Sequence, residues 1–182
     1  MILGCVLAGG QSQRFGSDKA LAELAGRSLL ARAVDALWGW CEAVVVVGRE
    51  TAPAPTLPDW PRPGMGPLGG LAAALRLAAD EGYEAVLTIG VDSTGLPDDL
   101  PALLGNAPAY IVGQPVIGLW SHPEQGVAGA ARAIEAVLAG TGRHSMRAFA
   151  EAIGARAVRL DLAPANINTP EDLALWQRRL DE

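Results

Sequence analysis

Residues 7–19 hold the combination of side chains most suited to chemistry. The segment reads Leu-Ala-Gly-Gly-Gln-Ser-Gln-Arg-Phe-Gly-Ser-Asp-Lys and ends at Lys19, the only lysine; the other 13 of the 14 basic residues are arginines. A lysine ammonium is a compact charge on a flexible stem and suits a phosphate, whereas arginine presents a planar fork. A glycine-rich loop that ends on such a charge predicts a cradle for a polyphosphate. The alternative is an ordinary surface turn.

Further polar side chains come shortly after two other apolar runs. Asp92 comes just after residues 85–89, and Asn166-Ile167-Asn168 comes after residues 157–160. Ligands of open α/β sheets bind at the carboxyl ends of the strands, so these side chains are expected to face the glycine loop. Mg²⁺ needs few protein carboxylates, because phosphate and water complete its shell, and Asp92 is therefore a candidate metal ligand. Its alternative role is an Asx turn that opens the Asp-Ser-Thr-Gly segment.

Two familiar nucleotide motifs do not fit. Lys19 is neither preceded by glycine nor followed by serine or threonine, so the loop is not a Walker A motif. Residues 64–69 match G-x-G-x-x-G, but a proline-rich stretch precedes them instead of a strand, which argues against a dinucleotide-binding dehydrogenase. Small residues before a helix can still let a ring or ribose lie against the backbone.

The elements that must position these residues alternate between strand and helix. Short apolar runs predict strands at residues 2–7, 43–47, 85–89, 109–112, 116–120 and 157–160. Helical spacing predicts helices at residues 28–38, 68–79, 97–104, 127–138 and 145–153, and a final helix N-capped by Thr169. This order predicts a three-layer α/β/α fold with a mostly parallel, Rossmann-like sheet, in one domain spanning residues 1–182.

Composition excludes several classes of protein. Half of the 182 residues are hydrophobic and 19% are charged, which argues against disorder. A net charge of −6 argues against a general nucleic-acid binder. The sequence shows neither a signal peptide nor a membrane span, so we expect a soluble, cytoplasmic protein. Cys5 and Cys41 are expected to be inert core thiols, and the two histidines are isolated, with no zinc-ligand spacing.

Four segments together resemble the molybdenum cofactor guanylyltransferases, the MobA family. Residues 7–21 resemble the family's L-A-G-G-x-S-x-R-M-G-x-D-K-A-L motif, and residues 66–71 its G-P-L-A/G-G-[IL] segment. Asp92 stands where the family has its metal-binding aspartate, and residues 166–173 resemble its N-[IV]-N-T-P-E-[DE]-L tail. The order and spacing hold from about residue 3 to residue 177.

The resemblance implies a reaction: GMP passes from Mg-GTP to the phosphate of molybdopterin, and pyrophosphate leaves. It implies that Arg14, Lys19 and Asp92 are catalytic, with Asp92 holding Mg²⁺. The expected GTP-binding residues are Leu7, Ala8, Gly9, Gly10, Lys19, Asp59, Gly66 and Asp92, and Asn166 and Asn168 are expected to face molybdopterin. A molybdenum-insertion protein and acceptor molybdoenzymes or their chaperones are the implied partners.

The chain departs from the family pattern at three places. Gly48-Arg49 comes after the second strand, where some members carry a nucleotide-contacting asparagine, and Asp92 lacks the usual D-x-P-[FY] continuation. Phe15 replaces methionine. Alternatives are a cytidylyltransferase acting on molybdopterin or a sugar-1-phosphate nucleotidyltransferase, both usually with L-A-A-G in the first loop. A non-catalytic GTP-binding sensor or cofactor chaperone is the alternative outside this class.

Overall fold

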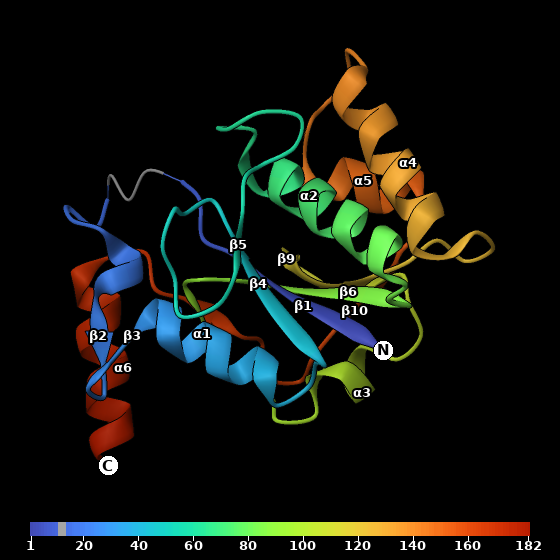
Figure 1. Ribbon diagram of the computed structural model, residues 1–182. Helices are drawn as coiled ribbons and strands as arrows, with labels where there is room; N and C mark the ends of the chain where they lie inside the picture. Colours follow the sequence, from blue (N-terminus) through green and yellow to red (C-terminus); the bar gives the residue numbers. More distant parts are fainter. Residues whose placement is uncertain (11–13) are drawn as a thin grey trace.

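A seven-stranded sheet is the centre of the computed structural model, which describes residues 1–10 and 14–182 (Figure 1). Its strands, in spatial order, are β10 (Arg156–Val158), β8 (Ala109–Ile111), β9 (Gln114–Trp120), β6 (Ala85–Gly90), β1 (Ile2–Leu7), β4 (Ala43–Val47) and β5 (Thr56–Leu57). β6, β1, β4 and β5 are parallel, whereas β9 runs antiparallel to both β6 and β8. The prediction of a mostly parallel α/β sheet is confirmed.

Helices cover both faces of the sheet (Figure 1). One face packs against α2 (Gly66–Glu81), α4 (Gly126–Ala139) and α5 (Met146–Ala152), and the other against α1 (Leu29–Trp38) and α3 (Leu100–Leu104). The alternation within β1 shows why: Leu3, Cys5 and Leu7 belong to the first core, while Val6 belongs to the second. Successive strand residues point to opposite faces, so a strand buried on both sides is apolar throughout.

A third, smaller core lies beside the sheet. The hairpin of β2 (Glu23–Leu24) and β3 (Arg27–Ser28) packs against α6 (Pro170–Asp181), which Figure 1 shows at one side of the molecule. Phe15, Leu24, Leu29 and Ile167 form its buried centre. This core therefore joins the end of the glycine loop to the segment that precedes the last helix.

Local capping explains where several helices begin. The Ser28 hydroxyl accepts a hydrogen bond from the Ala31 N–H at 3.1 Å, and Ser145 does the same for Ala148 at 3.1 Å. Thr169 and Asp172 form a reciprocal capping box at the start of α6. These bonds satisfy N–H groups that the first helical turn leaves unpaired. The predicted starts of these three helices are confirmed.

The sequence did not reveal the route by which the asparagine segment reaches the site. β10 lies at the far edge of the sheet from β4 and β5, so its carboxyl end does not deliver this segment to the glycine loop. Asn166 instead belongs to β11 (Ala165–Asn166), which pairs antiparallel with β7 (Ser93–Thr94) directly after Asp92. The segment reaches the site through this two-stranded ribbon, because the chain crosses back after β10.

Both thiols lie in the hydrophobic core. Cys5 and Cys41 are both buried free thiols, as expected. Burial raises the pKa of the Cys41 thiol to about 12 and that of Cys5 further still, so both stay protonated and unreactive.

In the described part of the chain, none of the helices is long and apolar enough to cross a membrane.

Candidate active site

Three strands end side by side at the candidate site. Leu7, the last residue of β1, pairs with Gly90 of β6 on one side and with Val47 of β4 on the other. The segments that leave these ends begin at Ala8, Gly48 and Val91. A parallel sheet thus brings the glycine loop and Asp92 together although more than 70 residues separate them in sequence.

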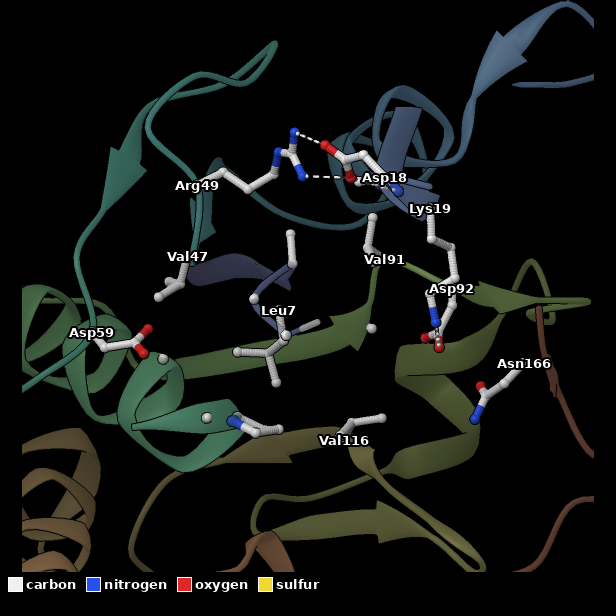
Figure 2. A pocket seen from close by; sticks show the side chains of 18 residues that line it. Leu7, Asp18, Lys19, Val47, Arg49, Asp59, Val91, Asp92, Val116 and Asn166 are labelled. Carbon is white, nitrogen blue, oxygen red and sulfur yellow. Dashed lines mark hydrogen bonds and ion pairs between the residues drawn. The ribbon is translucent and has the colours of Figure 1, made fainter. Parts of the chain in front are cut away.

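A cavity of about 250 Å³ opens at this edge (Figure 2). It is lined by the start of the glycine loop, the ends of the three strands, the start of α2 and one side chain from β11. Of the predicted site residues, the lining includes Leu7, Ala8, Gly9, Gly10, Lys19, Asp59, Gly66, Asp92 and Asn166. An adjoining cavity of about 510 Å³ shares Ala8, Gly10, Asp18 and Arg49 with the first.

Lys19 and Asp92 meet across this cavity. The Lys19 Nζ donates to the Asp92 Oδ2 at 2.8 Å, and the two side chains are 17% and 19% exposed. Figure 2 shows both side chains extending toward each other from different elements. A flexible ammonium and an oxygen donor for a hard cation thus stand at the same point, which is what charge neutralisation on a polyphosphate requires.

The glycine loop begins with a close approach to the end of β4. The Ala8 N–H donates to the Val47 carbonyl at 3.0 Å. Gly48 has a φ of +90°, and a Cβ built on it would lie 2.4 Å from the Gly9 Cα. Only glycine satisfies both the positive φ and this contact between two backbones.

Replacing Gly48 with alanine is expected to lower the free energy of unfolding by about 3 kcal/mol, because strain and overpacking add. Gly113→Ala is the matched control, since Gly113 has a φ of +78° but nothing within 4 Å of a built Cβ. Gly113→Ala should lower the free energy of unfolding by about 1 kcal/mol, from backbone strain alone. Urea denaturation of both variants checks this, and equal losses would contradict the backbone contact.

Asp18 and Arg49 form a second ion pair at the rim of the cavity. The two terminal guanidinium nitrogens of Arg49 donate to the two carboxylate oxygens of Asp18, at 3.0 and 2.7 Å. Bonding to Arg49 holds the pKa of Asp18 below its ordinary value, while the same bond raises the pKa of Arg49. The sequence interpretation assigned neither residue a role; the only signal was the position of Arg49, two residues beyond a buried strand.

The start of α2 forms the wall opposite this ion pair. The Asp59 carboxylate lines the cavity and accepts a hydrogen bond from the Met65 N–H at 3.0 Å. A Cβ built on Gly70 would lie 2.9 Å from a Leu7 methyl carbon, so the small residues of α2 let the helix pack closely on β1. Gly66 and Pro67 open the helix and also line the cavity.

Asn166 reaches the cavity from β11. The Ile167 N–H donates to the Asp92 carbonyl at 2.9 Å, and the Thr94 hydroxyl donates to the Ala165 carbonyl at 3.3 Å. The atypical segment after Asp92 thus pairs with the asparagine segment. The Asn166 Oδ1 is buried and has no hydrogen-bond partner within the described ranges, and Figure 2 shows the side chain beside Asp92.

Arg14 and Asn168 lie outside the lining of this cavity. Arg14 is exposed, and the Asn168 N–H donates to the Asp172 Oδ2 at 2.9 Å. The backbone N–H groups of Asn168 and Thr169 hold the pKa of Asp172 below its ordinary value, with a smaller contribution from the positive charge of Arg14. Arg14 and Asn168 therefore both lie near the start of α6. Residues 11–13 of the predicted loop lie outside the described residues.

Comparisons with known proteins found similar sequences over most of the chain. Residues 4–158 match the family model of the MobA-like NTP transferase domain. The chain is 39% identical to the molybdenum cofactor guanylyltransferase of Rhodobacter capsulatus, over 98% of this chain and 96% of that protein. It is 38% identical to the molybdenum cofactor guanylyltransferase of Acidiphilium cryptum, over 92% of this chain and 90% of that protein.

A solved structure shares the fold. Molybdopterin-guanine dinucleotide biosynthesis protein A of Archaeoglobus fulgidus superposes with a TM-score of 0.74 at 17% identity, covering 100% of this chain and 99% of that one. The family match spans the sheet and the glycine loop, and the two curated relatives extend over nearly the whole chain. The chain belongs to the MobA-like NTP transferase family and, within it, to the molybdenum cofactor guanylyltransferases.

Proposed function

We propose that this protein transfers GMP from GTP to the phosphate of molybdopterin. A phosphate oxygen of molybdopterin attacks the α-phosphorus in line, the bond to the β-phosphate oxygen breaks, and pyrophosphate leaves. The observation that carries the proposal is the 2.8 Å pair of Lys19 and Asp92 at the mouth of the glycine loop. The single domain of residues 1–182 performs this reaction.

Different residues of the cavity bind the nucleotide and neutralise its charge. The backbone of Ala8 to Gly10 holds the nucleotide, and the Lys19 ammonium turns from Asp92 toward the triphosphate to offset its charge. Asp59 and Gly66, on the opposite wall, face the nucleoside. Transfer between phosphates needs positioning and charge neutralisation more than a covalent nucleophile.

The donor set at Asp92 fits Mg²⁺. The cation is usually held by one or two carboxylates together with substrate phosphates and water, and Asp92 offers a partly exposed carboxylate inside the cavity. When bound there, Mg²⁺ neutralises charge on the α-phosphate side of GTP. Asp92 would hold the ion, and before the nucleotide binds the Asp92 carboxylate accepts a hydrogen bond from the Lys19 ammonium.

The pterin substrate enters from the β11 side. The Asn166 Oδ1, buried without a partner in the described chain, is an acceptor for an N–H group of the pterin. Asn168, at the start of α6, contacts the more distant part of molybdopterin, and Arg14 beside it offsets charge on the triphosphate and the leaving pyrophosphate. The product is an oxygen-sensitive cofactor, so direct transfer from a molybdenum-insertion protein and on to an acceptor molybdoenzyme or its chaperone is the proposed context, in the cytoplasm.

An assay with each nucleoside triphosphate in turn tests the proposal. With Mg²⁺ and molybdopterin, GTP should yield pyrophosphate and a guanine dinucleotide in equal amounts, and CTP should yield neither. Turnover with CTP alone would assign the cytidylyltransferase reaction instead. GTP binding without turnover of any nucleotide would identify a non-catalytic sensor or chaperone.

A further inference from the structure

We propose that Gly48-Arg49 fastens the glycine loop at both of its ends, and that Arg49 is a positioning residue that holds Lys19 in the cavity through Asp18. The inference rests on the proposed function only in taking GTP as the nucleotide. The dipeptide follows the second strand, where some members of the family carry an asparagine, and its contacts in this structure suit it to hold the loop.

The first attachment is at the start of the loop. Gly48 lies against Gly9, and the Ala8 N–H donates to the residue before Gly48 at 3.0 Å. The backbone of the first loop residues is thus fixed against the end of β4. The position of Arg49 relative to the loop is fixed by the same contact.

The second attachment is at the end of the loop. Arg49 makes its two bonds to both oxygens of Asp18, and the Asp18 Oδ1 also accepts a bond from the Ala20 N–H at 3.2 Å. Asp18 is therefore held from two sides, one of them a separate strand end. Because Lys19 is the next residue, fixing Asp18 fixes the point from which the Lys19 side chain extends.

The charges form one alternating row across the cavity. Arg49 bonds to Asp18, Lys19 comes next to Asp18 in the chain, and Lys19 bonds to Asp92 at 2.8 Å (Figure 2). Arg49 and Asp18 neutralise each other, so the pair adds little net charge toward a triphosphate. Its contribution is geometric, and it leaves the Lys19 ammonium as the cation that responds to the nucleotide.

The environment of Arg49 suits a guanidinium held in one orientation. Its side chain is 19% exposed, and its Nε is buried with no hydrogen-bond partner in the part of the chain that the structure describes. A planar guanidinium bonded twice loses its freedom before any ligand binds. A lysine in place of Arg49 would offer one point charge and could not fix both carboxylate oxygens of Asp18. Preorganisation of this kind lowers the free-energy cost of ordering Asp18 and Lys19 on binding.

Because Lys19 is the only lysine, its reactivity reports on the loop directly. Amine-selective labelling marks Lys19 and the N-terminus, and the N-terminal peptide serves as an internal reference in mass spectrometry. In the nucleotide-free Arg49→Ala variant, Lys19 should label several-fold faster relative to the N-terminus. Arg143→Ala, an exposed arginine between α4 and α5, is the matched control and should label like the unsubstituted protein.

Nucleotide binding gives the second measurement. Without metal, Arg49→Ala should weaken GTP binding about tenfold in calorimetry, since Asp18 and Lys19 must then be ordered on binding. kcat at saturating GTP should change far less than KM. Arg49→Lys should behave like Arg49→Ala, because it keeps the charge and loses the fork.

Asp18→Asn separates positioning from direct contact. Asparagine keeps an acceptor for the Ala20 N–H and removes the charged second oxygen, so Asp18→Asn should reproduce the Arg49→Ala result. Adding Arg49→Ala to Asp18→Asn should then cost almost nothing more. Additive losses, or weaker GTP binding with unchanged Lys19 labelling, would overturn the proposal. If the unsubstituted protein bound no GTP, the proposed function would fail while the labelling result would still test the loop attachment.

Discussion

In the Asp92→Asn variant, kcat/KM for guanylyl transfer should fall about 10³-fold while the fold persists. An amide oxygen lacks the charge that a hard cation requires, and it also weakens the bond to the Lys19 ammonium. The backbone role of this residue, accepting from the Ile167 N–H at 2.9 Å, is unaffected by the substitution. Initial rates across a Mg²⁺ titration give the size of the loss.

Two comparisons make the Asp92 result specific. Asp99→Asn changes an exposed aspartate near the start of α3 in the same way and should leave kcat/KM unchanged. GTP binding measured in the presence of a chelator should be nearly the same in Asp92→Asn and the unsubstituted protein. An Asp92→Asn enzyme with an ordinary rate and an ordinary Mg²⁺ dependence would remove Asp92 from the metal site.

Lys19→Ala should lower kcat/KM by about 10²-fold or more, because it removes a preorganised cation from the place where charge develops on the phosphates. Lys19→Arg keeps the charge but imposes a planar fork on a side chain that must move between Asp92 and the nucleotide, so it should recover only part of the rate. Steady-state kinetics with GTP and molybdopterin measure both variants.

Protection from labelling tests the same assignment without turnover. GTP should slow the amine-selective labelling of Lys19 and leave the rate at the N-terminus unchanged, since Met1 lies at the opposite end of β1 from the glycine loop. Equal labelling of Lys19 with and without GTP would show that the ammonium does not contact the nucleotide. The phosphate role of the loop would then have to be abandoned.

The features that could be predicted from the sequence are those encoded locally. Four successive valines end β4, Ser28 caps α1, and the apolar runs of β1 and β6 place Asp92 beside the glycine loop. Parallel pairing carries such information reliably, because a strand buried on both faces is apolar throughout and its carboxyl end is fixed by topology.

The features that were missed depend on pairings between distant short segments. β7 and β11 are two-residue strands whose pairing delivers Asn166, and a two-residue segment has no periodicity to detect. The Asp18–Arg49 ion pair was also missed, because no sequence motif links these two residues. The antiparallel direction of β9 also depends on tertiary pairing, since its apolar run resembles that of a parallel strand.

The small third core has a consequence for how the molecule opens. Its four buried residues are Phe15, Leu24, Leu29 and Ile167. The α6 side chains that pack on it, Leu173 and Trp176, are only partly buried. The two cores of the sheet contain many more buried apolar residues, so we expect α6 and the hairpin to separate at a lower free energy than the sheet unfolds. Because the Ile167 N–H donates to the Asp92 carbonyl and Ile167 comes directly after Asn166, each such opening should also loosen the side of the site that we propose for the pterin. We therefore expect a bulky dinucleotide to leave by a partial unfolding that the sheet does not share.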